Sequence, residues 1–121
     1  MSKTPTAISL REVVGSEFCV ASSDGDEVYN KILSAFHGNH SVVLSFKGVT
    51  ALTSAFLNSA IGRLYGQFDE KTIRAMLRVA EIAPEDKALL RRVTETAKVY
   101  FKHPELFSAA GDETVDSSDE P

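Results

Sequence analysis

The chain has 121 residues, of which 13 are Lys or Arg, 17 are Asp or Glu and 43% are hydrophobic. This length provides for one globular domain and excludes a two-domain enzyme that carries its own cofactor-binding fold. The net charge of −4 is concentrated at one end, because Ser108 to Pro121 holds five acids and no Lys or Arg. The remaining near-neutral body creates no field that would gather nucleic acid.

The sequence also predicts a location in the cell. It contains no run of about 18 apolar residues that could span a membrane, and its first twenty residues lack the pattern of a secretory leader. The single cysteine, Cys19, has no partner for an internal disulfide, which suits a reducing compartment. We therefore expect a cytoplasmic domain over residues 8–103, with no membrane contact, and an acidic, disordered tail over residues 104–121.

The first predicted elements are two strands and a helix. Apolar residues favour strands over 8–14 and 18–21, and Gly15 between them predicts a hairpin. Asp24 and Glu27 have the spacing of a capping box at a helix start. The expected buried face of that helix has helical spacing, and it consists of Val28, Ile32, Ala35 and Phe36. Gly38 is predicted to end the helix in the left-handed conformation.

Further along the chain, strands and helices alternate. The continuous apolar run 42–46 is typical of a strand covered on both faces. A helix is expected over 55–65, a half-exposed strand over 72–80, and a last helix from Pro84. The buried stripe of the last helix is expected to be Leu89, Val93, Ala97, Tyr100 and Phe101. The order β-β-α-β-α-β-α predicts an α/β domain with a mixed four-stranded sheet and helices.

Residues that could carry catalysis are sparse. His37, His40 and His103 lie in predicted turns and helix ends, where solvated side chains are the usual outcome. The sequence has no phosphate-binding glycine loop, no serine nucleophile elbow and no cluster with metal-ligand spacing. We therefore expect no catalytic residue, no metal site, no cofactor and no enzymatic activity.

The most informative segment is 41–68, where a buried strand leads through Gly48 to Thr53 and Ser54 at a helix start. Two hydroxyls at a helix amino end fit simple capping, for which Ser and Thr are preferred. The same position also favours an anion and would tolerate a phosphate on Ser54. From the residues alone, capping is the favoured interpretation.

Two runs in this segment resemble a known signature. The strand VVLSFKGV (42–49) and the helix start TSAFL (53–57) resemble the signature of STAS domains, the sulphate transporter and anti-sigma-factor antagonist family. The fuller pattern is similar to a bacterial STAS-like family without an assigned function, through TSxFLN (53–58) and AIGxLY (60–65). The resemblance implies the STAS-like α/β fold.

The resemblance also bears on single residues. Ser54 falls on the serine that is phosphorylated in anti-sigma-factor antagonists, Thr53 on the preceding Asp, and Ala55 on a second Ser. Phe56 stands where that signature has Gly. A phenylalanine there implies either a different docking surface or a side chain that is turned inward.

Two hypotheses on function follow. The resemblance implies a non-catalytic regulatory protein-interaction module that docks on a histidine-kinase-like ATPase or anti-sigma factor and is switched by a phosphate on Ser54. Its expected surface residues are Thr53, Ser54, Asn58, Arg63 and Asp24. The alternative is a small-molecule or anion-binding domain, or an enzyme, that uses the helix amino end at Thr53–Ser54, with Arg74 and Arg78 as nearby cations. The sequence does not decide the oligomeric state.

Overall fold

The computed structural model describes residues 4–103 as an α/β arrangement; the predicted tail, 104–121, lies outside the described residues. The strands are β1 (Thr6–Ser9), β2 (Phe18–Cys19), β3 (Val42–Ser45), β4 (Ala51–Leu52) and β5 (Leu77–Ala80). The helices are α1 (Leu10–Val14), α2 (Ser22–His37), α3 (Ser54–Ala60), the 3-10 helix η1 (Gly62–Gly66), α4 (Glu70–Met76) and α5 (Pro84–Lys102).

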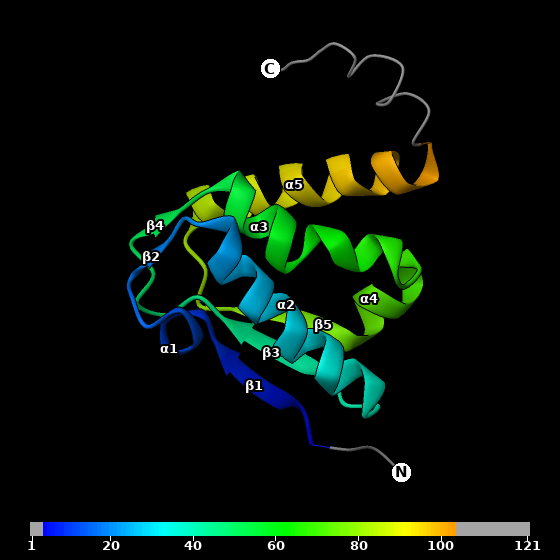
Figure 1. Cartoon of the computed structure of the whole chain (residues 1–121), viewed down its shortest axis with the longest axis horizontal. Coiled ribbons are helices and arrows are strands. Elements are labelled where there is room, and N and C mark those ends of the chain that lie inside the picture. Colours follow the sequence, from blue (N-terminus) through cyan, green and yellow to red (C-terminus); the bar gives the residue numbers. More distant parts are fainter. Residues whose placement is uncertain (1–3, 104–121) are drawn as a thin grey trace.

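The main sheet has three parallel strands in the order β1-β3-β5, with Ile8 beside Leu44 and Leu44 beside Val79. Helices α2, α3 and α5 are stacked on one side of this sheet (Figure 1). Leu44 is accordingly fully buried, whereas Ala7 and Arg78 on the opposite face are exposed. The prediction that strand 42–46 is covered on both faces is therefore wrong, because helices cover only one face.

The predicted opening hairpin is also wrong. Strand β1 ends at Ser9, whose hydroxyl accepts a hydrogen bond from the backbone N–H of Glu12 at 3.2 Å and starts helix α1. Gly15 ends α1 with a φ of 78°. Strand β2 then pairs in parallel with β4, not with β1. The described residues thus form a three-stranded and a two-stranded parallel sheet, because a local Ser-x-x-Glu capping signal prevails over the apolar alternation.

Helix α2 has the predicted buried face but different ends. Val28, Ile32 and Phe36 are buried as predicted, and Ala35 is half-buried. The helix begins at Ser22 without a side-chain cap, so Asp24 lies inside its first turn and the predicted capping box is wrong. Gly38 has a φ of −84°, and Asn39 adopts the left-handed conformation with a φ of 67°.

Helices α2 and α3 cross at close range through Gly25. A Cβ on this buried residue would lie 2.5 Å from the backbone carbonyl oxygen of Phe56 and 2.7 Å from Cβ of Ser59. Phe56 itself is fully buried, as are Leu57 and Ala60. This contact sets the position of α3, and therefore of its amino end, against α2.

The second half of the chain differs from prediction at element ends. The predicted strand 72–80 begins as helix α4, capped by Asp69, and only its last four residues form β5. The predicted helix 55–65 ends at Ala60, after which η1 continues with tighter turns. Val93 and Ala97 of α5 are buried as predicted, but Tyr100 and Phe101 are 43% and 42% exposed, with the Phe101 ring lying against Gly66 of η1.

Candidate functional site

The amino end of α3 is closed by Thr53. The hydroxyl of Thr53 accepts a hydrogen bond from the backbone N–H of Phe56 at 3.1 Å. It also donates to the carbonyl oxygen of Val20 at 2.7 Å, which ties α3 to the residue that follows strand β2. Both roles of this hydroxyl are therefore used inside the fold, and the predicted cap at Thr53 is confirmed.

Ser54 is in a different position from Thr53. It is the first residue of α3, it is exposed, and its hydroxyl makes no hydrogen bond with any residue from 4 to 103. With Asn58 it lines a hollow of about 280 Å³ between α3 and α5, where Arg92 and Thr96 form the other wall. Because Thr53 serves as the cap, the Ser54 hydroxyl remains accessible to an external molecule.

These two hydroxyls should respond differently to removal. Thr53→Ala should lower the free energy of unfolding by about 1 kcal/mol, and up to about 2 kcal/mol, through loss of the cap. Ser54→Ala should change it by less than about 0.5 kcal/mol, as expected for an exposed residue without a contact. Urea unfolding of the two variants side by side checks this. Equal losses in both variants would mean that Ser54 also stabilises the helix start.

Asn58 and Arg63 continue the same face. Asn58 is exposed one turn after Ser54, and with Arg63 and Tyr100 it lines a second hollow of about 290 Å³. Arg63 is engaged within the fold: its Nη2 donates to Asp26 Oδ1 at 3.1 Å and its guanidinium lies 3.9 Å from the ring centre of Tyr29. Arg63 therefore joins η1 to α2, a role that the spacing of Arg63 and Asp26 in the sequence does not reveal.

Asp24 lies in the first turn of α2, directly before the Gly25 that packs against α3, and it is half-buried and lines neither hollow. Its carboxylate acts on Cys19 instead. Burial and, to a smaller extent, the Asp24 charge raise the pKa of the Cys19 thiol to about 11. This thiol is fully buried and stays protonated at neutral pH, so Cys19 packs as a small hydrophobic residue.

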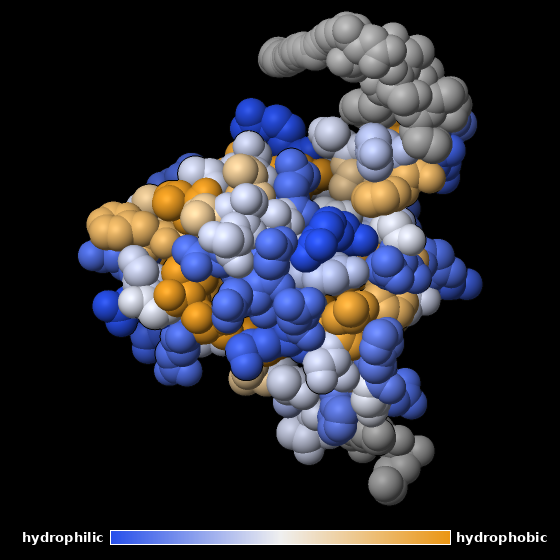
Figure 2. All heavy atoms as spheres, in the orientation of Figure 1, coloured by the Kyte–Doolittle hydropathy of each residue, from blue (hydrophilic) through white to orange (hydrophobic). Residues whose placement is uncertain are grey.

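The strand beside Thr53 carries exposed apolar side chains. Phe18 is 53% exposed and Val20, whose carbonyl accepts from Thr53, is 42% exposed. Apolar side chains gather at the end of the molecule where β2 and β4 lie (Figure 2). The sequence interpretation missed this pair, because it placed residues 18–21 inside a hairpin; the alternation of Phe18 and Val20 around buried Cys19 was the available signal.

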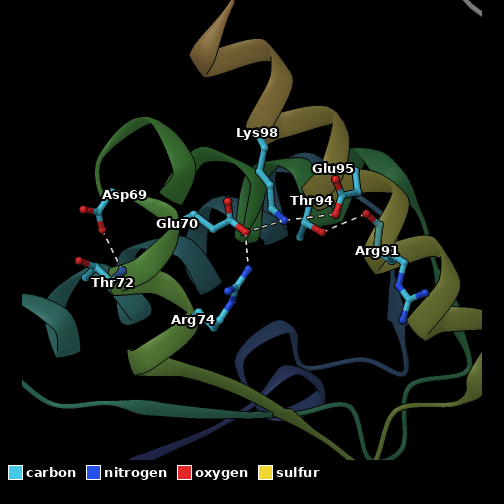
Figure 3. Close-up of polar contacts among 8 residues, drawn as sticks. All are labelled: Asp69, Glu70, Thr72, Arg74, Arg91, Thr94, Glu95 and Lys98. Atoms are coloured by element: carbon cyan, nitrogen blue, oxygen red, sulfur yellow. Dashed lines mark hydrogen bonds and ion pairs between the residues drawn. The ribbon is translucent and has the colours of Figure 1, made fainter.

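A second polar region lies between α4 and α5. Lys98 Nζ is 2.9 Å from Glu70 Oε2 and 3.2 Å from Glu95 Oε2, and Arg74 donates to the same Glu70 oxygen (Figure 3). The hydrogen bond from Lys98 lowers the pKa of Glu70, and the same bond raises the pKa of Lys98. Arg74 thus lies on a helix and is paired, contrary to its expected place on a strand, while Arg78 lies on the exposed face of β5.

Two features are absent from residues 4–103. Within that range no helix combines the length and the apolar character needed to cross a bilayer. Over the same residues, no three His, Cys, Asp or Glu side chains come together as a group able to hold a metal ion.

The described residues form an α/β domain with an exposed serine at the start of α3. The sequence profile of the STAS-like domain of unknown function (DUF4325) matches residues 24–87, more than half of the chain. The chain therefore belongs to this STAS-like family, as the motif at 53–65 predicted. Neither a curated protein nor a solved structure matches the chain significantly.

Proposed function

We propose that this STAS-like domain is a non-catalytic regulatory module that binds a protein partner through the surface around Ser54. The observation that carries the proposal is the accessible Ser54 hydroxyl, which no residue from 4 to 103 engages, because Thr53 performs the capping. The resemblance to anti-sigma-factor antagonists suggests the partner class, a histidine-kinase-like ATPase or anti-sigma factor.

The neighbouring apolar residues support a protein partner. Phe18 in β2 and Val20 directly after it expose about half of their surface, and the carbonyl oxygen of Val20 accepts from Thr53. Aromatic side chains of this kind commonly anchor protein interfaces, and truncating such an anchor costs about 2 kcal/mol or more of binding free energy. We therefore expect Ser54, Asn58, Phe18 and Val20 to form one contact surface, called the Ser54 surface below.

A phosphate on Ser54 would act as the switch. It adds about −1.5 to −2 charges at neutral pH, and a partner that covers the Ser54 surface would have to remove water from that charge. The proposed consequence is weaker docking of the phosphorylated domain.

The alternative of an anion site at the start of α3 has less support. Both hydrogen-bonding roles of the Thr53 hydroxyl are used by Phe56 and Val20, so of the two hydroxyls only that of Ser54 would remain to hold a ligand. Helix α3 spans only seven residues, which leaves a small dipole at its start.

The test is capture of partners from the native host with the full chain and its Ser54→Ala and Ser54→Asp variants. We expect one ATPase of the histidine-kinase-like type to be captured by the wild type and by Ser54→Ala, and to be lost with Ser54→Asp. Phe18→Ala should weaken the same capture at least tenfold, which corresponds to about 1.4 kcal/mol.

Ser34→Asp serves as the matched control, since Ser34 is an exposed serine in the last turns of α2. It should leave the capture unchanged. The same proteins captured by Ser54→Asp and by the wild type, together with the absence of phosphate on Ser54 in mass spectra, would contradict the proposal.

A further inference from the structure

An open cleft of about 750 Å³ lies in the described part of the molecule, and none of its lining residues belongs to the Ser54 surface. It is formed by the last turns of α5, the end of η1 and the start of α4. Its apolar walls are aromatic side chains, namely Tyr65, Phe68 and Phe101. Charged side chains surround them, namely Asp69, Glu70, Lys71, Arg74, Lys98 and Lys102. We call this the α4–α5 cleft.

The charges in the α4–α5 cleft are unequal, with four cations and two carboxylates. Glu70 is shared by Arg74 and Lys98 (Figure 3). Asp69 is occupied as the cap of α4, since its Oδ1 accepts from the backbone N–H of Thr72 at 2.8 Å. Lys71 and Lys102 are exposed and have no ion pair among residues 4–103. The cleft therefore offers two unpaired cations beside aromatic walls, an arrangement suited to an anionic chain with some apolar residues.

Such a chain follows directly from the rim of the cleft. Phe101 and Lys102 line it, and residues 104–121 continue from there. This acidic segment has six carboxylates (Glu105, Asp112, Glu113, Asp116, Asp119 and Glu120), no Lys or Arg, and apolar side chains at Leu106, Phe107 and Val115. Eighteen extended residues reach up to about 60 Å, so length does not limit access.

Covalent attachment also favours this occupant over a free anion. A segment tethered at the rim is present at an effective concentration on the order of millimolar. Even weak binding of the segment would therefore keep the cleft occupied. Each exposed ion pair contributes only about 0.2–1 kcal/mol, but several can form at once along one chain. Contacts of Leu106 or Phe107 with the aromatic walls would add burial that simple charge attraction lacks.

We propose that the acidic segment 104–121 binds in the α4–α5 cleft of its own chain, with its carboxylates against Lys71 and Lys102. The cleft is then covered from within the molecule, and an external anionic partner has to displace this segment. The proposal does not depend on the function of the Ser54 surface.

A spin label on the full chain tests the proposal. Thr114→Cys places a thiol between Glu113 and Asp116, and the native Cys19 is fully buried, so the label attaches selectively. We expect the amide signals of Lys71, Arg74 and Lys102 to lose intensity at low salt. The loss should disappear at about 1 M NaCl, where the screening length falls to about 3 Å.

Two double variants make the test specific. Lys71→Gln with Lys102→Gln should abolish the intensity loss around α4. Lys31→Gln with Lys87→Gln removes the same charge from exposed lysines that do not line the cleft and should preserve the loss. An unchanged pattern in the first variant, or an equal loss over the whole surface, would overturn the proposal. So would a loss that appears only between labelled and unlabelled copies, since that would assign the contact to a second molecule.

Discussion

Phe56→Ala should lower the free energy of unfolding by about 3–5 kcal/mol, the usual cost of emptying a fully buried phenylalanine site. Phe56 has no exposed surface and belongs to the hydrophobic core together with Leu57 and Ala60. A loss of this size is a large fraction of the stability of a domain of this length. Urea unfolding monitored by circular dichroism measures it.

Two further variants test whether the loss of stability comes from emptying the buried site of Phe56. Phe56→Leu keeps the site apolar and most of it filled, and should cost less than about 1.5 kcal/mol. Phe18→Ala removes an exposed ring and should change stability by about 0.5 kcal/mol or less. If Phe56→Ala and Phe18→Ala were equally stable, the placement of Phe56 in the core would be incorrect.

Gly25→Ala should destabilise the protein by about 1–3 kcal/mol, as expected for overpacking at a close contact. The added methyl would lie 2.5 Å from the backbone carbonyl oxygen of Phe56, so α2 and α3 would have to separate. An ordinary Gly→Ala change inside a helix has the opposite effect, because it raises the free energy of unfolding by about 0.5–1 kcal/mol.

Gly38→Ala is the matched control for this prediction. Gly38 follows α2 with a φ of −84°, and its nearest neighbour would be the flexible His40 side chain at 3.3 Å. We expect its stability to change by less than about 0.5 kcal/mol. A Gly25→Ala protein more stable than wild type would show that the two helices are farther apart than described here.

Phe56 and Gly25 also bear on the Ser54 surface. The STAS signature has Gly where this chain has Phe56, and here that side chain turns inward and is fully buried. The exposed residues of α3 are Ser54, Ala55 and Asn58, while Gly25 lets the buried side of α3 approach α2. The core and the proposed contact surface thus occupy opposite sides of one short helix.

The sequence alone predicted the features that depend on neighbours in the chain. The buried face of α2, the strand at β3, most of α5 and the cap at Thr53 follow from apolar spacing and capping chemistry. The motif at 53–65 predicted the STAS-like family, which the match over residues 24–87 shows. A local signal was also present where the prediction failed. Ser9 and Glu12 have the spacing of a helix cap, but the apolar residues over 8–14 favoured a strand instead.

The tertiary structure decided the features that join distant residues. The pairing of β2 with β4, the one-sided sheet and the bond from Thr53 to Val20 across 33 residues have no local signature. The same holds for Arg63 and Asp26, which are 37 residues apart, and for the meeting of α4 with α5 around Glu70 and Lys98. Such contacts form only when the chain packs a shared core, so spacing along the chain does not encode them. For the same reason, only the fold shows that Thr53 is the cap and that Ser54 is left accessible.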